Sequence, residues 1–430
     1  NADVRVAIKP SEEGQVIAAL YQHVTGKQTA KVSDAIMKNT KAAGEMLKAQ
    51  MGRGETLVVA GANDVNVQIL VNALNFELGN YNNTININNP ISMFMGKDAE
   101  VEKLFNELSD KDAILIYGCN PVYSLPKSLN VAAKIKGAKL SISFAGYADE
   151  TATQCQYIAP DHHYLEAWND ANPQYNHYAI QQPLIRPLYK TAPWQESLLV
   201  WSGLAQRVKD STVYVDLIKA NWKKWGYEMF GGNQKFATFG EYWNFHLHNG
   251  GSSDPMPPMF TTPLAWMGNT AEAGAAIDGW QGGEWQAIYY QKIGMGDGQQ
   301  ANNPWLQELP DPISRVTWDN YVTMNPEQMR EKGFNLLIAQ NYPATKLKVT
   351  LDKGTLELPV YPSPGQAKNT IGIALGYGRG ANGENIGRSA FQTGEYGDYL
   401  KEENKMIAIG KNAFHHTSIN GGYITYNTLK

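Results

Sequence analysis

The sequence predicts an α/β fold in which a doubly wound parallel sheet is followed by a C-terminal β-rich domain, which we expect to be a small barrel. Two observations support this prediction. In residues 1–210 short apolar segments alternate with helical patterns, whereas after residue 333 short strand patterns follow one another, separated by Gly, Pro and Asn. Residues 211–333 are instead rich in Trp, Tyr, Gly and Pro, which favours irregular connections. We therefore expect three regions: 1–210, 211–333 and 334–430.

The first region begins with two helical patterns and then alternates strands with helices. Ser33 is a suitable N-cap for the second helix, and the apolar run 55–61 is typical of a first buried strand. Because loops after the carboxyl ends of parallel strands share one rim, we expect the loops 61–64, 118–123 and 145–151 to lie together. The expected helices cover residues 12–24, 33–50, 64–78, 101–108 and 129–135, and the expected strands cover 55–61, 113–117 and 140–144.

Tryptophans are the most prominent side chains of the middle region. They can pack inside the region or against a neighbouring chain, and the sequence leaves both alternatives open. The tryptophans concerned are Trp222, Trp225, Trp243, Trp266, Trp280, Trp285 and Trp305. In the last region, the expected strands cover residues 336–338, 347–351, 355–360 and 370–375.

Composition excludes several functions. With 430 residues, 18% of them charged, and a net charge of −4, the chain lacks a concentrated basic face, so we expect no nucleic-acid partner. No apolar stretch approaches the ~20 residues that cross a bilayer. The chain starts at Asn1 with neither Met nor a signal peptide, which indicates a processed or incomplete polypeptide.

The two cysteines, Cys119 and Cys155, are too few for a four-cysteine iron–sulfur or zinc site, and no Cys-x-x-Cys-His motif is present for haem attachment. We expect both to be small buried side chains. A disulfide between them is the alternative, which needs an oxidising compartment and close Cα atoms. The sequence therefore predicts no self-contained redox centre of these kinds.

Two motifs indicate ligand binding only weakly. The letters Gly-x-Gly-x-x-Gly at 378–383 follow a strand pattern but precede no helix, so a bound pyrophosphate would lack a helix N-terminus. His162, His163 and Glu166 have a helical spacing that could bring metal ligands to one face. No further ligand is identifiable, so a structural role is the preferred interpretation.

Other polar residues also favour structural roles. The pair Asp149–Glu150 follows a strand, where capping of the next element is the preferred interpretation and an acid/base couple is the alternative. His246 and His248 would share one face of a strand, and the pair 415–416 would point to opposite faces. No Gly-x-Ser-x-Gly elbow is present, so hydrolysis has no support.

Several longer passages are more specific than these motifs. In their order along the chain they resemble the molybdopterin oxidoreductase superfamily and, within it, the exported variant that forms the large iron–sulfur subunit of alternative complex III. The resemblance spans nearly the whole chain. The passages are residues 115–126, 147–151, 160–170, 182–188, 303–312, 318–321, 362–370 and 375–379.

The resemblance implies a molybdopterin-oxidoreductase-like α/β fold that ends in a double-psi-like β barrel. Two sets of residues would occupy loops that hold or line the pterin nucleotide site in catalytic relatives. Because the resembling subunit carries no molybdenum cofactor, we expect no catalytic, cofactor-binding or metal-binding residue in this chain. The residues of these former pterin loops are Gly118, Asn120, Pro121, Asp149, Glu150 and Thr151 on the α/β side, and Gly376, Tyr377, Gly378 and Arg379 on the barrel side.

The resemblance also implies partners. The 4Fe–4S and 3Fe–4S clusters of the family are expected in a separate ferredoxin-like half, and haem c in partner subunits. Those partners would be multihaem cytochrome c subunits, integral membrane subunits with the quinol site and accessory subunits, with a terminal cytochrome oxidase as a further candidate. The expected location is the periplasmic face of the bacterial inner membrane, held there by the complex.

The expected function is a scaffold in a respiratory complex that oxidises quinol and passes electrons to cytochrome c or a terminal oxidase. Two alternatives remain open. The chain could be a working molybdopterin-dependent oxidoreductase subunit, in which the bound cofactor performs the chemistry. It could also be a free periplasmic binding protein whose aromatic side chains stack on a ligand.

Overall fold

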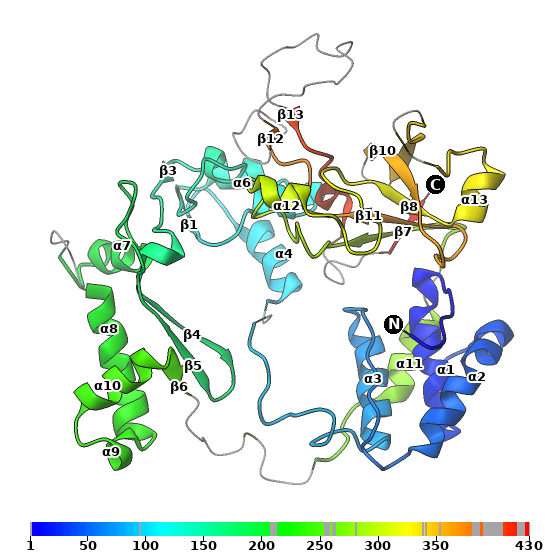
Figure 1. Cartoon of the computed structure of the whole chain (residues 1–430), viewed down its shortest axis with the longest axis horizontal. Coiled ribbons are helices and arrows are strands. Elements are labelled where there is room, and N and C mark those ends of the chain that lie inside the picture. The colour runs from blue at the N-terminus through cyan, green and yellow to red at the C-terminus, as the bar shows by residue number, and fades with distance from the viewer. Residues whose placement is uncertain are drawn as a thin grey trace.

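The computed structural model shows a mixed α/β chain with parallel and mixed sheets, which confirms the predicted fold class in its coarse form. Four groups of elements can be followed in Figure 1. No helix in the described part of the chain has the length and apolar character needed to cross a membrane. The structure describes residues 2–93, 96–206, 213–252, 259, 264–279, 282–337, 339, 342–351, 354–380, 388–389, 407–418 and 426–429.

The first group is a cluster of helices around one apolar core. The three helices predicted first are confirmed to within a few residues; Ser33 accepts a hydrogen bond from the backbone N–H of Ile36, which caps the second helix. A helix from the middle region packs on the first and third, and its Ile277 is fully buried there. The helices are α1 (Glu13–Thr25), α2 (Asp34–Ala49), α3 (Val65–Glu77) and α11 (Thr270–Asp278).

The strand predicted at 55–61 is wrong, because this segment pairs with no other strand. Its central backbone groups are satisfied by a side chain instead. Asn75 of α3 accepts a hydrogen bond from Val58 N–H at 3.0 Å and donates one to Val58 C=O at 2.8 Å. A strand pattern in the sequence shows only that an extended segment is partly covered, and here the element that covers it is a helix.

The second group contains a three-stranded parallel sheet in the order β1-β2-β3. Two strands and two helices predicted here are confirmed within a few residues, and Ile114, Ile116 and Ile135 are buried between sheet and helices. The sheet is smaller than expected because segment 55–61 does not join it. The elements are α4 (Asp98–Glu107), β1 (Ala113–Ile116), α5 (Pro121–Ser124), α6 (Val131–Gly137), β2 (Leu140–Ser143) and β3 (Tyr157–Ile158).

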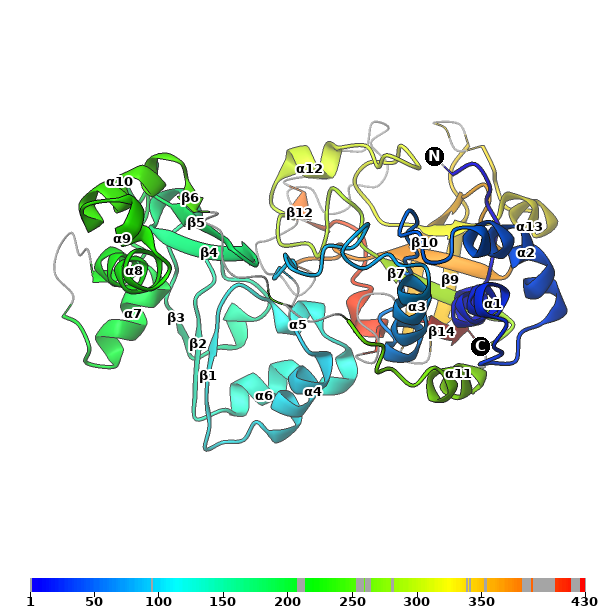
Figure 2. The ribbon, with the colours of Figure 1, turned by 90° about the horizontal axis from the view of Figure 1, so that it is seen from below.

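The third group combines a three-stranded antiparallel sheet with aromatic helices, and Figure 2 shows it at the opposite end of the molecule from the α1–α3 cluster. His246 and His248 lie on a helix of this group, so the predicted strand there is wrong. The elements are β4 (Asn169–Gln174), β5 (His177–Gln181), α7 (Trp194–Trp201), α8 (Val213–Trp222), a π-helix (Lys223–Met229), α9 (Gly232–Lys235), α10 (Phe239–His248) and β6 (Gly251–Ser252).

Some tryptophans of the middle region pack inside the protein, and others are exposed at its surface. Trp222 and Trp243 are buried, whereas Trp225 and Trp305 are 46% and 81% exposed. Trp280 lies outside the described residues.

The fourth group is a six-stranded mixed sheet in the order β14-β7-β11-β8-β10-β9. Two of its strands come from the middle region, which therefore contributes to the core sheet and does not only connect the other two regions. A closed barrel is not present among the described strands: the edge strands β14 and β9 approach each other, but each forms a hydrogen-bonded ladder only with its other neighbour. The strands are β7 (Trp285–Tyr290), β8 (Val322–Met324), β9 (Lys346–Leu351), β10 (Gly354–Pro362), β11 (Thr370–Ala374) and β14 (Tyr426–Leu429).

Three of the four strands predicted after residue 333 are confirmed as β9, β10 and β11. The strand predicted at 336–338 is not present at residues 336–337, which are the part of it that the structure describes. The buried core of the sheet includes Val322, Val360 and Ile373. The remaining elements are helices α12 (Pro304–Glu308) and α13 (Pro326–Glu331) and the two-stranded pair β12 (Arg388–Ser389) and β13 (Ile407–Ala408).

Candidate functional site

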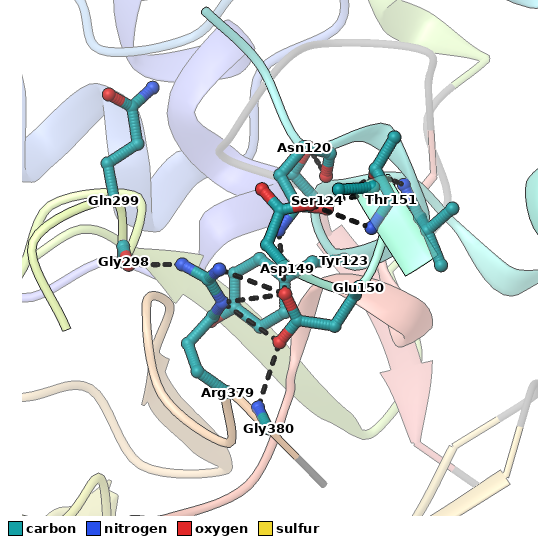
Figure 3. Close-up of polar contacts among 12 residues, drawn as sticks. Asn120, Tyr123, Ser124, Asp149, Glu150, Thr151, Gly298, Gln299, Arg379 and Gly380 are labelled. Atoms are coloured by element: carbon teal, nitrogen blue, oxygen red, sulfur yellow. Dashed lines mark hydrogen bonds and ion pairs between the residues drawn. The ribbon is translucent and has the colours of Figure 1, made fainter. Parts of the chain in front are cut away.

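Two loops meet at the rim of the parallel sheet, where β1 and β2 end. The Thr151 hydroxyl donates a hydrogen bond to Asn120 Oδ1 at 2.6 Å, and Asn120 Nδ2 donates one to Glu150 Oε2 at 2.7 Å (Figure 3). Asn120 directly precedes Pro121, which begins α5. Because both loops follow parallel strands, the sequence pattern was sufficient to expect this proximity.

The third loop expected at this rim, 61–64, is not brought there. Ala62 N–H donates to a carboxylate oxygen of Glu13, and Asp64 caps α3. The expectation was wrong because segment 55–61 packs on α3 and is no strand of the sheet.

The adjacent carboxylates Asp149 and Glu150 have different roles. Asp149 Oδ1 accepts hydrogen bonds from the backbone N–H groups of Thr151 and Ala152, so it caps the short 3₁₀ helix that follows, as expected. Burial raises the pKa of Asp149. Glu150 caps nothing and points across the rim to the C-terminal sheet.

Glu150 forms a buried ion pair with Arg379, which follows β11. Arg379 Nη2 lies 2.9 Å from Glu150 Oε2, Arg379 Nε lies 3.0 Å from Oε1, and the N–H of Gly380 donates to Oε1 at 2.8 Å. The two side chains are only 7% and 3% exposed. Burial alone would raise the pKa of Glu150, but the hydrogen bonds and charge of Arg379 outweigh it and hold this pKa below its ordinary value.

Tyr123 packs beneath this ion pair. The Arg379 guanidinium lies 4.6 Å from the centre of the Tyr123 ring, a cation–π arrangement. The Tyr123 hydroxyl donates to the carbonyl of Tyr377 at 2.7 Å, which joins α5 directly to the loop after β11. Burial raises the pKa of Tyr123, so the hydroxyl stays protonated and remains a donor.

A fourth loop, 294–299, completes the site and was missed by sequence reasoning. Arg379 Nη1 donates to the carbonyl of Gly298, and Gln299 Nε2 donates to that of Gly118. Gly298 has φ +84°, and a Cβ there would lie 2.7 Å from the carbonyl oxygen of Gly376. The run Gly294-Met-Gly-Asp-Gly298 could have indicated such a tight turn.

The loop after β11 therefore contacts the other three loops. Gly376 and Gly378 have φ +90° and +72°, and a Cβ on Gly378 would lie 2.2 Å from the backbone nitrogen of Asn412. Both positions require glycine because the backbone is left-handed and closely packed. Residues 381–383 of the Gly-x-Gly-x-x-Gly letters lie outside the described residues.

The four loops do not fit a pterin nucleotide in this arrangement. The family resemblance would put such a cofactor between the loops after β1 and β2 and the loop after β11, but Glu150, Arg379 and Tyr123 join these loops by direct contact. Inserting the cofactor there would break the ion pair and leave two buried charges unpaired.

Metal binding has no support either within the described residues, since no group of three or more His, Cys, Asp or Glu side chains could hold an ion. The three residues that the sequence offered as weak metal-ligand candidates form local hydrogen bonds instead. His162 contacts the Thr191 hydroxyl, His163 Nδ1 accepts from Leu165 N–H, and Glu166 accepts from Leu188 N–H.

Cys119 and Cys155 are free thiols, so the disulfide alternative is wrong. Cys119 is exposed and Cys155 is partly buried, which corrects the expectation that both are buried. Cys119 lies on the loop after β1 and is the more accessible of the two.

Lys292 lies beside the site in a cage of tyrosine rings. Its ammonium is 3.9 Å from the centre of the Tyr321 ring and 5.4 Å from that of Tyr377, and the residue is 7% exposed. Burial lowers the pKa of Lys292 to about 8, although Asp311 and Asp319 oppose this shift. The cage stabilises the cation less well than water does.

Lys292→Met is expected to change how stability depends on pH. Folded Lys292 loses its proton near pH 8 and unfolded Lys292 near its ordinary value of 10.5, so the unfolded state binds more protons between these values and stability rises with pH. The free energy of unfolding of the wild type relative to the variant should therefore rise by about 3 kcal/mol between pH 8 and 10.5. Urea unfolding over this range measures it.

The matched control is Lys332→Met, which removes an exposed ammonium 5.0 Å from the centre of the Trp285 ring. That variant should follow the wild type at every pH. A constant difference in stability between Lys292→Met and the wild type from pH 8 to 10.5 would contradict the assignment.

Comparison with known proteins gives a partial match. No protein-family model matches the sequence. The molybdopterin-binding-like subunit of menaquinone reductase from Nitratidesulfovibrio vulgaris is 29% identical over 112 residues, which are 25% of this chain and 16% of that protein. Acetylene hydratase from Pelobacter acetylenicus superposes with a TM-score of 0.41 and 15% identity, over 69% of this chain and 44% of that chain. The chain thus spans less than half the length of either protein. Over the 112 matched residues it is distantly similar to a molybdopterin-binding-like subunit.

Proposed function

We propose that this chain is a cofactor-less scaffold in the iron–sulfur subunit of a quinol-oxidising respiratory complex of the alternative complex III type. The observation that carries the proposal is the buried Glu150–Arg379 pair, which directly joins the loops that the family resemblance assigns to a pterin nucleotide. A scaffold can keep a fold after its cofactor chemistry is lost.

The proposed partners are multihaem cytochrome c subunits, integral membrane subunits and accessory subunits, with the iron–sulfur clusters in a ferredoxin-like half outside these residues. An exposed apolar segment supports assembly with another protein. Leu184, Leu188 and Tyr189 are 74%, 72% and 80% exposed, and hydrogen bonds from Leu184 N–H to Leu165 C=O and from Leu188 N–H to Glu166 hold this segment in place. Apolar side chains fixed outward in this way are typical of interfaces.

The relative's name supports a quinone-linked complex, although a reductase reduces quinone and the proposed complex oxidises quinol. The relative is called a menaquinone reductase subunit and is described as molybdopterin-binding-like. We extend the quinone chemistry in that name to this chain only as part of the proposal, and assign electron transfer to the proposed partners and to the ferredoxin-like half.

Metal and pterin analysis tests the proposal. The complex purified through this chain is expected to contain iron and haem, with molybdenum or tungsten below about one-tenth of an atom per chain and no released pterin fluorescence. Stoichiometric molybdenum with pterin would instead establish the rival function, a working molybdopterin-dependent oxidoreductase subunit. In that case the Glu150–Arg379 contact would have to open to admit the cofactor.

A matched pair of variants sharpens this experiment. Glu150→Ala and Arg379→Ala remove the ion pair, and under the scaffold proposal neither variant acquires molybdenum or pterin. Molybdenum and pterin gained by these variants but absent from the wild type would instead point to a cofactor site that the ion pair closes.

A further inference from the structure

A pocket of about 520 Å³ lies in the third group of elements, away from the rim loops. Its walls come from the β4–β5 hairpin, α8, the π-helix and α10. The volume lies within the range of small-molecule sites, roughly 300–1,000 Å³. Aromatic side chains make up much of the wall: Tyr178, Trp222, Trp225, Phe230 and Tyr242.

The π-helix Lys223–Met229 builds one side of this pocket. It continues α8 and carries Trp225 and Gly226, which both line the pocket. Such wide turns are rare and occur frequently at functional sites. A Cβ on Gly226 would lie 2.1 Å from the Tyr242 hydroxyl, so the backbone here lies directly against an aromatic side chain.

The aromatic side chains include both fixed and accessible rings. Trp222 is buried, and its Nε1 donates to Asp170 Oδ2 at 3.1 Å, which fixes the ring. Trp225 and Phe230 are 46% and 41% exposed, and their ring planes lie 25° apart with centroids 6.4 Å apart. These accessible rings next to a buried one form a surface on which a flat ligand can stack in place of the Lys224 ammonium, which lies 4.9 Å from the centre of the Trp225 ring.

Polar side chains also line the pocket, and some of them already form hydrogen bonds within the protein. The Asn172 side-chain amide donates to the carbonyls of Gln174 and His177, and one Asp170 oxygen is bound by Trp222. The Asn176 side-chain oxygen is buried and has no hydrogen-bond partner within the described residues. The second Asp170 oxygen is the carboxylate acceptor at this wall, and it calls for a donor on the ligand.

We propose that this pocket binds a planar aromatic ring that carries a hydroxyl group. The ring would stack on Trp225 and Phe230, and its hydroxyl would donate to the acceptors beside Trp222. The proposal is independent of the scaffold function, since no pocket residue belongs to the rim loops.

The test uses the full chain and 2-naphthol as the probe, measured by calorimetry and saturation-transfer NMR. We expect saturable binding of one 2-naphthol per chain. Trp225→Ala should weaken it at least tenfold, and Phe230→Ala severalfold, because each removes part of the stacking surface. The methyl ether of 2-naphthol, which lacks the donor, should bind several times more weakly.

The matched control is Trp305→Ala, which removes a more exposed tryptophan of α12 outside the pocket and should leave the affinity for 2-naphthol unchanged. Thermal unfolding checks that all three variants are folded. If Trp225→Ala does not fold, the affinities of Phe230→Ala for 2-naphthol and of the wild type for the methyl ether still test the proposal. Binding that does not saturate, equal loss in Trp225→Ala and Trp305→Ala, or preference for methyl β-glucoside over 2-naphthol would each overturn the proposal.

Discussion

Glu150→Ala is expected to lower the free energy of unfolding by about 3–5 kcal/mol, the range for breaking a buried ion pair. The substitution leaves the Arg379 guanidinium at 3% exposure with its carboxylate partner removed. The carbonyl of Gly298 and the ring of Tyr123 still contact it, but neither carries a compensating charge. The cost of an unpaired buried cation therefore dominates.

Urea unfolding measures the loss, and hydrogen exchange locates it. Exchange should become faster at Thr151 and Gly380 on the two sides of the rim, because the Glu150 carboxylate joins these loops. The double variant Glu150→Ala with Arg379→Ala should be about 1–3 kcal/mol more stable than the sum of the single effects predicts, since no unpaired charge remains.

A surface ion pair provides the control for this measurement. Lys97 and Glu100 lie 3.0 Å apart, but their side chains are 72% and 70% exposed. Glu100→Ala should therefore cost at most about 1 kcal/mol. If Glu150→Ala were as mild as Glu100→Ala, the rim loops would not be joined by the ion pair, and the main support for a cofactor-less scaffold would be lost.

Half of this site could be expected from the sequence. The loops of Asn120 and Thr151 follow two adjacent parallel strands, so their proximity follows from the strand pattern alone. Arg379 is 229 positions from Glu150, and no local pattern relates residues so far apart. The family resemblance placed both near one cleft, but their direct pairing depends on how the two sheets face each other.

The errors in the fold have a common cause. Burial patterns predict which residues are covered and leave open what covers them. Segment 55–61 is extended and partly buried, yet it lies against α3 and not against a strand. His246 and His248 alternate as in a strand, but Thr238 and Glu241 form a capping box that begins the helix around them. A capping box can be recognised in the sequence, and this one indicates that the segment with His246 and His248 is a helix.

Asn75→Ala is expected to destabilise the α1–α3 cluster by about 2–4 kcal/mol, because two buried backbone groups would lose their partners. Asn75 is 2% exposed, and its side chain substitutes for the neighbouring strand that Val58 lacks. It also accepts a hydrogen bond from Asn80 at 2.7 Å, so the variant breaks three hydrogen bonds at once.

Asn72→Ala on the same helix is the matched control, since Asn72 is exposed and accepts one hydrogen bond, from the Tyr81 hydroxyl. This variant should cost less than about 1 kcal/mol. Chemical unfolding compares the two variants, and hydrogen exchange at the Val58 amide distinguishes a local effect from a global one. The Val58 amide should lose protection in Asn75→Ala alone. Unchanged protection there would mean that burial against α3, and not the Asn75 side chain, keeps this unpaired extended segment in place.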